Sequence, residues 1–166
     1  MPPLLTSKIP TLFGPLPLRT LLLTTTKLLA FTHLFLTHFL SLKPTTGPSM
    51  LPTLSVHNDW ILISNLHVRG RGVRVGDCVS LRHPVEPEVG AVKRVVGVGG
   101  DFVEVGEEGV IQIPEGHCWV VGDNLPHSRD SRVYGPIPLA LIKGKVIGRI
   151  WPRPKWITNA LQEPAT

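Results

Sequence analysis

The stretch GAVKRVVGV, residues 90–98, decides the fold class. It is rich in valine and begins at a glycine, a composition that predicts a β-strand. Six other short runs rich in Val and Ile lie on either side, separated by Gly, Pro, Asn or Asp. They are WILISNLHV (60–68), VGDCVSLRH (75–83), DFVEV (101–105), GVIQIP (109–114), CWVVGD (118–123) and IKGKVIGRIW (142–151). We therefore predict a mainly β body over residues 43–152, as two sheets or a distorted barrel.

An apolar segment precedes this β-rich body. Residues 20–42, TLLLTTTKLLAFTHLFLTHFLSL, contain neither proline nor glycine and reach the ~20 residues that a helix needs to cross a bilayer. We predict one transmembrane helix over 20–42 that ends at Lys43-Pro44, because proline disfavours helical geometry in the residue before it. Lys27 would cost about 2.5–3.5 kcal/mol at a helix centre. The alternative is an amphipathic helix lying on the membrane, since apolar residues from Leu28 to Phe39 recur at helical spacing.

The charges are distributed unevenly along the chain. None of the 12 acidic residues and only four of the 17 Lys and Arg residues precede Asp59. The body therefore lacks the clustered basic surface that nucleic-acid binding requires, and we expect no nucleic-acid partner. Residues 1–19 are basic, free of acid and broken by five prolines, which favours a targeting leader. Residues 153–166 are expected to form a loose C-terminal tail.

Neither cysteine nor histidine indicates a metal site. Cys78 and Cys118 each stand alone among strand-like residues, and the seven histidines show no ligand spacing. We expect two buried, reduced thiols; a disulfide between them is the alternative in an oxidising compartment. We predict no metal and no cofactor.

Two stretches carry residues that could form a nucleophile and a base. In TTGPSMLPTL, residues 45–54, glycine and prolines place Ser49 on an irregular turn. In AVKRVVGVGGD, residues 91–101, strand alternation sends Lys93 and Arg94 to opposite faces, so one of them points toward the apolar side. Burial lowers the pKa of a lysine, and a neutral amine can take the proton of a serine hydroxyl. Taken separately, each stretch also has a simpler interpretation: Ser49 as an ordinary turn serine, and Lys93 as an edge-strand lysine with its amine in water.

The third stretch, VVGDNLPHSRDSRVYGPIP, spans residues 120–138 and places a Gly-Asp-Asn turn directly after a strand. Two hydroxyls, a carboxylate and a guanidinium follow within five positions: Ser128, Asp130, Ser131 and Arg132. Asp130 can pair with one of three arginines: Arg94, Arg129 or Arg132. Taken alone, such a cluster is a loop held by its own ion pairs.

Together and in this order, the three stretches resemble the sequence boxes of the signal peptidase I family, most closely those of the mitochondrial inner membrane peptidase, first catalytic subunit. SMLPTL resembles the nucleophile box, KRVVGVGGD the lysine box, and GDNLPHSRDSRVYGPIP the C-terminal box. The resemblance covers roughly residues 28–152. It implies an antiparallel β-sheet catalytic body with one N-terminal transmembrane helix. It also implies a serine endopeptidase that removes sorting or signal peptides from precursor proteins.

The resemblance assigns a role to each matching residue. Ser49 would be the nucleophile and Lys93 the general base, with Ser128 orienting the lysine amine. The Ser49 backbone N–H would donate one hydrogen bond to the oxyanion. Structural support of the site would come from Asp130 and Arg132, with Arg94 as an ion-pair partner.

The sequence departs from the family pattern at Gly47. Many bacterial relatives carry a hydroxyl residue two positions before the nucleophile, which supplies the second oxyanion donor. Here either Thr45 or Thr46 reaches in, a backbone amide replaces the hydroxyl, or a weaker oxyanion hole suffices. A smaller departure is Gly99, where bacterial relatives often have proline, and this change should affect only the turn.

The resemblance also implies a location and a partner. We expect an enzyme of the mitochondrial inner membrane whose catalytic domain faces the intermembrane space, working as a heterodimer with a second, related peptidase subunit. The alternatives are a non-catalytic partner subunit of the same complex and a plastid or bacterial-type signal peptidase. A self-cleaving repressor uses a similar Ser–Lys pair, but residues 1–42 are too apolar for the DNA-binding domain that it would need.

Overall fold

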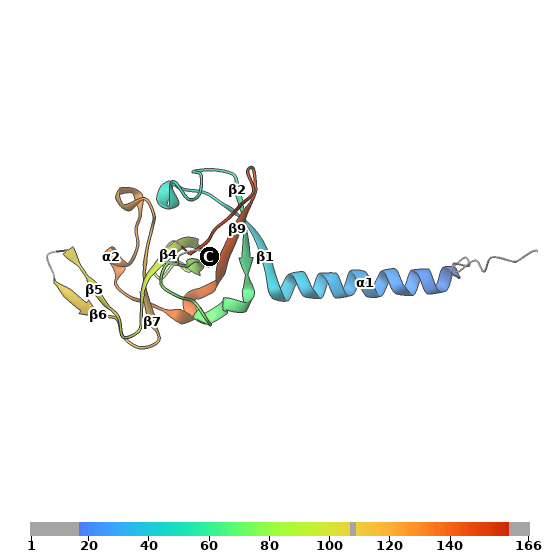
Figure 1. Cartoon of the computed structure of the whole chain (residues 1–166), viewed down its shortest axis with the longest axis horizontal. Helices are drawn as coiled ribbons and strands as arrows, with labels where there is room; N and C mark the ends of the chain where they lie inside the picture. Colours follow the sequence, from blue (N-terminus) through green and yellow to red (C-terminus); the bar gives the residue numbers. More distant parts are fainter. Residues whose placement is uncertain (1–16, 107–108, 160–166) are drawn as a thin grey trace, which may run out of the picture. The chain divides into compact units, whose positions relative to one another are not determined.

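A computed structural model describes residues 17–106 and 109–159. The chain divides into two units, Met1–Phe35 and Leu36–Thr166. The first contains most of helix α1, and the second contains the strands (Figure 1). The predicted leader, residues 1–19, lies almost wholly outside the described residues, as does the end of the predicted tail.

Helix α1, Leu18–Phe39, is the one helix in the described ranges that is long and apolar enough to cross a membrane. Its 22 residues extend about 33 Å, against about 30 Å for the hydrocarbon core of a bilayer. None of its residues is buried within the protein. The hydroxyls of Thr24 and Thr25 donate to backbone carbonyls one turn earlier, which provides hydrogen bonds for polar groups in an apolar segment.

The boundaries of this helix differ from the prediction. The helix ends at Phe39, and Lys43-Pro44 does not end it, because Leu40–Thr45 already forms strand β1. Pro44 is tolerated there because β1 is an edge strand that pairs only with β2. Lys27 lies close to the middle of α1, where insertion of a charge into a bilayer is most costly.

The second unit is built on one eight-stranded sheet in which every pair of neighbours is antiparallel. The strand order is β1-β2-β9-β3-β4-β7-β8, and β10 pairs with β9. A separate hairpin is formed by β5, Phe102–Glu104, and β6, Val110–Gln112. The remaining strands of the large sheet are β2 (Asp59–Ser64), β3 (Cys78–Arg82), β4 (Gly90–Val98), β7 (His117–Val121), β8 (Ile137–Pro138), β9 (Ile142–Trp151) and β10 (Lys155–Trp156). The predicted mainly β fold is confirmed.

Short helical turns connect these strands. They are η1 (Pro48–Met50), η2 (Asn65–Gly70), η4 (Leu125–His127), α2 (Ser131–Tyr134) and η5 (Leu139–Leu141). The predicted strand 60–68 therefore ends at Ser64, because the chain turns into η2.

The predicted loose tail is wrong for residues 155–159. Lys155 and Trp156 pair with Arg149 and Gly148 of β9. Asn159 is buried, and its amide donates to the Val75 carbonyl at 2.7 Å and to Asp77 Oδ1 at 3.0 Å. A two-residue strand and one amide anchor leave no periodic pattern in the sequence, so this docking could not be predicted from it.

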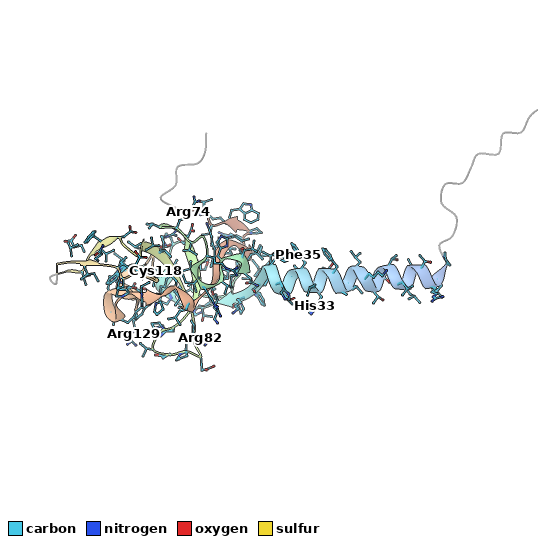
Figure 2. All side chains as sticks on the ribbon, turned by 90° about the horizontal axis from the view of Figure 1, so that it is seen from below. His33, Phe35, Arg74, Arg82, Cys118 and Arg129 are labelled. Carbon is cyan, nitrogen blue, oxygen red and sulfur yellow. The ribbon has the colours of Figure 1, made fainter. Side chains whose placement is uncertain are left out.

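Two core clusters support the site. One joins β3, β4 and β7 through residues such as Val79, Val95 and Val120. The other lies below η1 and includes Met50 and Leu54. Cys78 and Cys118 are buried, free thiols, as expected, and β4 lies between their strands β3 and β7. Figure 2 labels Cys118 within the strand-containing unit. Burial raises the pKa of each thiol to about 12, so both remain protonated and unreactive.

Candidate active site

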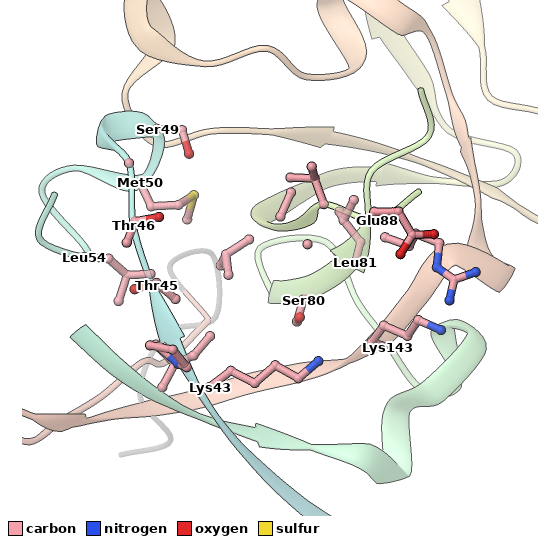
Figure 3. Close-up of a pocket in the computed structure, with 18 of the residues that line it drawn as sticks. Lys43, Thr45, Thr46, Ser49, Met50, Leu54, Ser80, Leu81, Glu88 and Lys143 are labelled. Atoms are coloured by element: carbon pink, nitrogen blue, oxygen red, sulfur yellow. The ribbon is translucent and has the colours of Figure 1, made fainter. Parts of the chain in front are cut away.

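Ser49 lies on the short helical turn η1, at one end of a cleft of about 540 Å³ (Figure 3). Pro48 starts the turn, and the next residue, Met50, is buried in the core below it, with Leu54. These two apolar side chains fix the turn to the sheet, while Ser49 stays half-buried and reaches the cleft. The predicted irregular turn is thus present.

Asn124 tethers this turn from the other side. Its backbone N–H donates to the Ser49 carbonyl at 3.0 Å, and its side-chain amide donates to the Pro48 carbonyl at 3.0 Å. Two hydrogen bonds on consecutive carbonyls restrict both the position and the rotation of the peptide unit that carries Ser49.

Lys93 is the buried member of the Lys93–Arg94 pair. It lies in β4 opposite Val79 and is only 4 % exposed. Its amine donates to Ser128 Oγ at 3.0 Å. Burial lowers the pKa of Lys93, and the carboxylate of Asp130 opposes this only in part. The neutral amine, which can accept a proton, is therefore more populated than in an ordinary lysine.

Gly122 brings the Ser49 turn and the Ser128 loop together. A Cβ atom at this position would overlap the Ser128 hydroxyl and would lie 2.5 Å from the Ser49 carbonyl oxygen. Only glycine fits between the two serines, and Ser128 in turn contacts Lys93. In the described part of the chain the Ser49 hydroxyl makes no hydrogen bond. Ser49 is connected to Lys93 indirectly, because Gly122 lies against both serines and Ser128 accepts a hydrogen bond from Lys93.

Asp130 is fully buried and organises the loop that carries Ser128. Its carboxylate accepts from Arg132 at 2.8 Å and from the Gly122 N–H at 3.0 Å, and it also accepts from the backbone N–H of Arg132 as the N-cap of α2. Burial alone would raise the pKa of this carboxyl, but the hydrogen bonds from Arg132 and Gly122 hold it below its ordinary value. Arg132 also donates to the Leu125 carbonyl at 2.7 Å, which closes the loop.

Arg94 is not the partner of Asp130. It binds Asp123 through two hydrogen bonds of 2.8 Å each and donates to the Gly76 carbonyl at 2.8 Å. Asp123 also accepts a hydrogen bond from the hydroxyl of Thr53, four residues after the candidate nucleophile. This contact links β4 to the Ser49 turn. Sequence reasoning treated Asp123 and Asn124 only as turn formers and missed Thr53 and Gly122.

The surroundings of Gly47 narrow the choice of second oxyanion donor. The Gly47 N–H already donates to the Val56 carbonyl at 2.7 Å, and the Thr45 hydroxyl donates to the Asp59 carbonyl at 3.1 Å. Thr46 is exposed and lines the same cleft as Ser49. Of the two threonines considered from sequence, Thr46 is the one whose hydroxyl makes no hydrogen bond within the described residues.

Within residues 17–106 and 109–159 no group of three His, Cys, Asp or Glu side chains is arranged to hold a metal ion.

Comparison with known proteins identifies the family. The family described as "Signal peptidase, peptidase S26" matches residues 18–113 and 106–151. The chain is 42 % identical over 138 residues to mitochondrial inner membrane protease subunit 1 of Schizosaccharomyces pombe, covering 81 % of this chain and 88 % of that protein. It is 38 % identical over 136 residues to subunit 1 of Saccharomyces cerevisiae, covering 72 % of each. It is 36 % identical over 116 residues to subunit 2 of Danio rerio, covering 66 % of this chain and 63 % of that protein.

The family match covers more than half of the chain and includes all three sequence boxes and the antiparallel sheet that brings them together. The chain therefore belongs to the signal peptidase family, peptidase S26.

Proposed function

We propose that this peptidase is a membrane-bound serine endopeptidase of the mitochondrial inner membrane in which Ser49 is the nucleophile and Lys93 the general base. The observation that carries the proposal is the Lys93 amine, which is 4 % exposed and 3.0 Å from Ser128 Oγ. Lys93 directly follows Val92, which lines the same cleft as Ser49. A lysine buried without a carboxylate partner is costly, so its retention is best explained by a use for the neutral amine.

The geometry supports a two-step acyl transfer. Lys93 takes the proton of the Ser49 hydroxyl as Ser49 Oγ attacks the scissile carbonyl carbon. The Ser49 N–H and the Thr46 hydroxyl stabilise the oxyanion. Lys93 then gives the proton to the leaving amine as the C–N bond breaks, which leaves an ester on Ser49. Water, deprotonated by Lys93, hydrolyses this ester and restores the serine.

Ser128 acts on Lys93 rather than on the substrate. Ser128 accepts a hydrogen bond from the Lys93 amine. This contact fixes the orientation of the amine, and with it the direction of the nitrogen lone pair in the neutral form. Asp130, Arg132 and Gly122 hold the Ser128 loop against β7 and act as structural support. Arg94 supports the Ser49 turn through Asp123.

We further propose that α1 spans the inner membrane and that the catalytic body faces the intermembrane space. The substrates would be precursor proteins with sorting peptides, already held in the same bilayer. Anchoring enzyme and precursor in one membrane raises their effective concentration. Since relatives are named as subunits 1 and 2 of an inner membrane protease, the partner would be a second, related peptidase subunit in a heterodimer.

Precursor processing in mitochondrial membranes tests this function. Wild type, Ser49→Ala and the control Ser41→Ala are expressed in cells that lack the endogenous first subunit, with the partner subunit present. Ser41 donates to Asn65 on the sheet and does not line the cleft. We expect processing by wild type and Ser41→Ala and none by Ser49→Ala at equal levels of inserted protein. Processing by Ser49→Ala would assign the chemistry to another subunit.

A further inference from the structure

The cleft that begins at Ser49 changes character along its length. Buried apolar side chains line it, including Ile61. Met50 and Leu54 lie on the side of Ser49, and Leu81 lies farther along (Figure 3). The far end of the cleft is charged, lined by Lys43, Arg82, Lys143 and Glu88. We call Lys43, Arg82 and Lys143 the cationic end of the cleft.

Three different strands supply the cationic end. Lys43 comes from β1, Arg82 is the last residue of β3, and Lys143 follows Ile142, which pairs with Leu81 across β3 and β9. Figure 3 shows Lys143 and Glu88 on the side of the cleft away from Ser49, with the Lys43 side chain extended toward Lys143. The three cations are therefore brought together by the fold, although they are far apart in the sequence.

None of these charges is neutralised by an ion pair. The described residues contain four ion pairs, which use Arg94, Arg132, Lys145 and Arg149 with Asp123, Asp130, Asp77 and Asp59. Among the described residues, no carboxylate lies within ion-pair distance of the cationic end, and Glu88, the one acidic residue of the described cleft lining, offsets only one of the three positive charges. The far end of the cleft thus has a net positive charge.

Isolated surface lysines and arginines usually need no explanation, because their side chains are solvated. Here all three are exposed and line the same cleft as the candidate nucleophile. A peptide bound with its scissile carbonyl at Ser49 and extended along this cleft places a residue some distance from the cut bond beside the three cations. The charge that complements this position is negative.

We propose that the cationic end is a specificity-determining subsite that binds an acidic side chain, Asp or Glu, of the precursor, several residues from the bond that is cut. This inference rests on the proposed function, since it concerns the selection of substrates by the same cleft. The contact is solvent-exposed, so it contributes modestly: we expect about a threefold to fivefold gain in kcat/KM from one well-placed acidic residue. The gain should shrink with salt, because the screening length falls from about 10 Å at 0.1 M to about 3 Å at 1 M.

The test is a positional scan with the full chain and its partner subunit in phosphatidylcholine vesicles. A single Glu or Gln is moved through six positions on each side of the cut bond of a peptide that wild type cleaves. The ratio of kcat/KM for the Glu peptide to that for the Gln peptide is measured at each position. We expect one position at which the ratio reaches about three to five, and ratios near one elsewhere.

Variants assign this preference to the cationic end. In Lys143→Gln and Arg82→Gln the ratio should fall toward one, and in Glu88→Gln it should rise. In the double variant Arg82→Glu, Lys143→Glu the net charge of this end changes sign, so a Lys peptide should become preferred over the Glu peptide at the same position, a reversal that mere loss of structure cannot produce. Lys155→Gln is the matched control, because Lys155 is exposed on β10 and does not line the cleft; its ratio should equal that of wild type.

The outcomes separate this inference from the proposed function. Equal rates for Glu and Gln peptides at every position, with the precursor still processed, would overturn the subsite alone. A preference that persists when Lys43, Arg82 and Lys143 are all changed to Gln would also overturn it, because another surface would then recognise the acid. Failure of wild type to process any precursor would contradict the proposed function itself.

Discussion

The proposed base and the proposed nucleophile of this peptidase are held in different ways. Lys93 lies in the middle of a long strand, paired with β3 and covered so that 4 % of it is exposed. Ser49 lies outside the sheet on a one-turn helix that depends on two buried apolar side chains and on hydrogen bonds from Asn124. The proposed base is thus held by burial in the sheet, and the position of the proposed nucleophile is set by hydrogen bonds from a neighbouring loop.

The difference corresponds to what each group needs. A lysine acts as a base only when its surroundings disfavour the charged amine, and a sheet interior provides this. A serine needs access to substrate and a precise direction, which an exposed turn held by a few hydrogen bonds provides. Changes on the lysine side should therefore alter chemistry or stability strongly, whereas changes around Ser49 that keep the serine itself should reduce the rate by degrees.

The largest expected effect is that of Lys93→Met. Methionine fills the buried space but cannot accept a proton, so kcat/KM should fall by about 10³-fold or more while the body stays folded. Processing of a precursor and thermal unfolding measure the two quantities. Lys155→Gln is the control. Residual activity within tenfold of wild type would show that Lys93 is not the base.

Asp130→Asn should lower the free energy of unfolding by about 3 kcal/mol, because it leaves Arg132 without its partner and weakens the buried bond to Gly122. The folded pKa of Asp130 lies below its ordinary value of 3.8. Its contribution to stability is therefore fully present at neutral pH and is lost as the pH falls below that value. Chemical denaturation measures the free energy of unfolding of wild type and variant at both pH 7 and pH 3. The difference between the two proteins should be smaller at pH 3 than at pH 7.

Glu104→Gln serves as the control for this loss of stability, since Glu104 is exposed on the β5–β6 hairpin. A stability of Asp130→Asn equal to that of Glu104→Gln at pH 7 would contradict the role given to the buried carboxylate.

Much of the architecture could be predicted from sequence, because valine-rich and isoleucine-rich runs bounded by turn residues determine strands locally. The three strands that were missed, β1, β8 and β10, contain prolines or only two residues and depend on their neighbours in the sheet. The Lys93–Ser128 contact agrees with what the family resemblance implied. The Thr53–Asp123–Arg94 link was not foreseeable, because it joins three segments that are distant in the chain and have no shared pattern.

Next to the proposed nucleophile, Thr46→Val should lower kcat by about 10²-fold. It removes the Thr46 hydroxyl, which lines the cleft and makes no hydrogen bond within the described residues. KM should change little, because the oxyanion forms only in the transition state. Thr46→Ser, which keeps the hydroxyl, should recover most of the rate. A wild-type rate in Thr46→Val would assign the second donor to the backbone.

The smallest effect is expected for Asn124→Ala. The backbone bond to Ser49 remains, and only the amide bond to Pro48 is lost, which corresponds to about 1 kcal/mol. A fall in kcat of about fivefold, with little change in stability, should be seen in steady-state cleavage of a quenched peptide. Gln112→Ala, which removes an amide bond to Gly100 on the remote hairpin, should leave kcat unchanged. Equal kcat values for the two variants would mean that this tether does not position Ser49.

The pH dependence of kcat/KM for the wild-type enzyme tests the central claim most directly, that burial makes Lys93 the base. The neutral amine is the active form, so the rate should rise with pH along a limb whose pKa lies below the ordinary lysine value of 10.5. That limb should disappear from the residual activity of Lys93→Met. A limb at or above 10.5, or the same limb in the variant, would contradict the account.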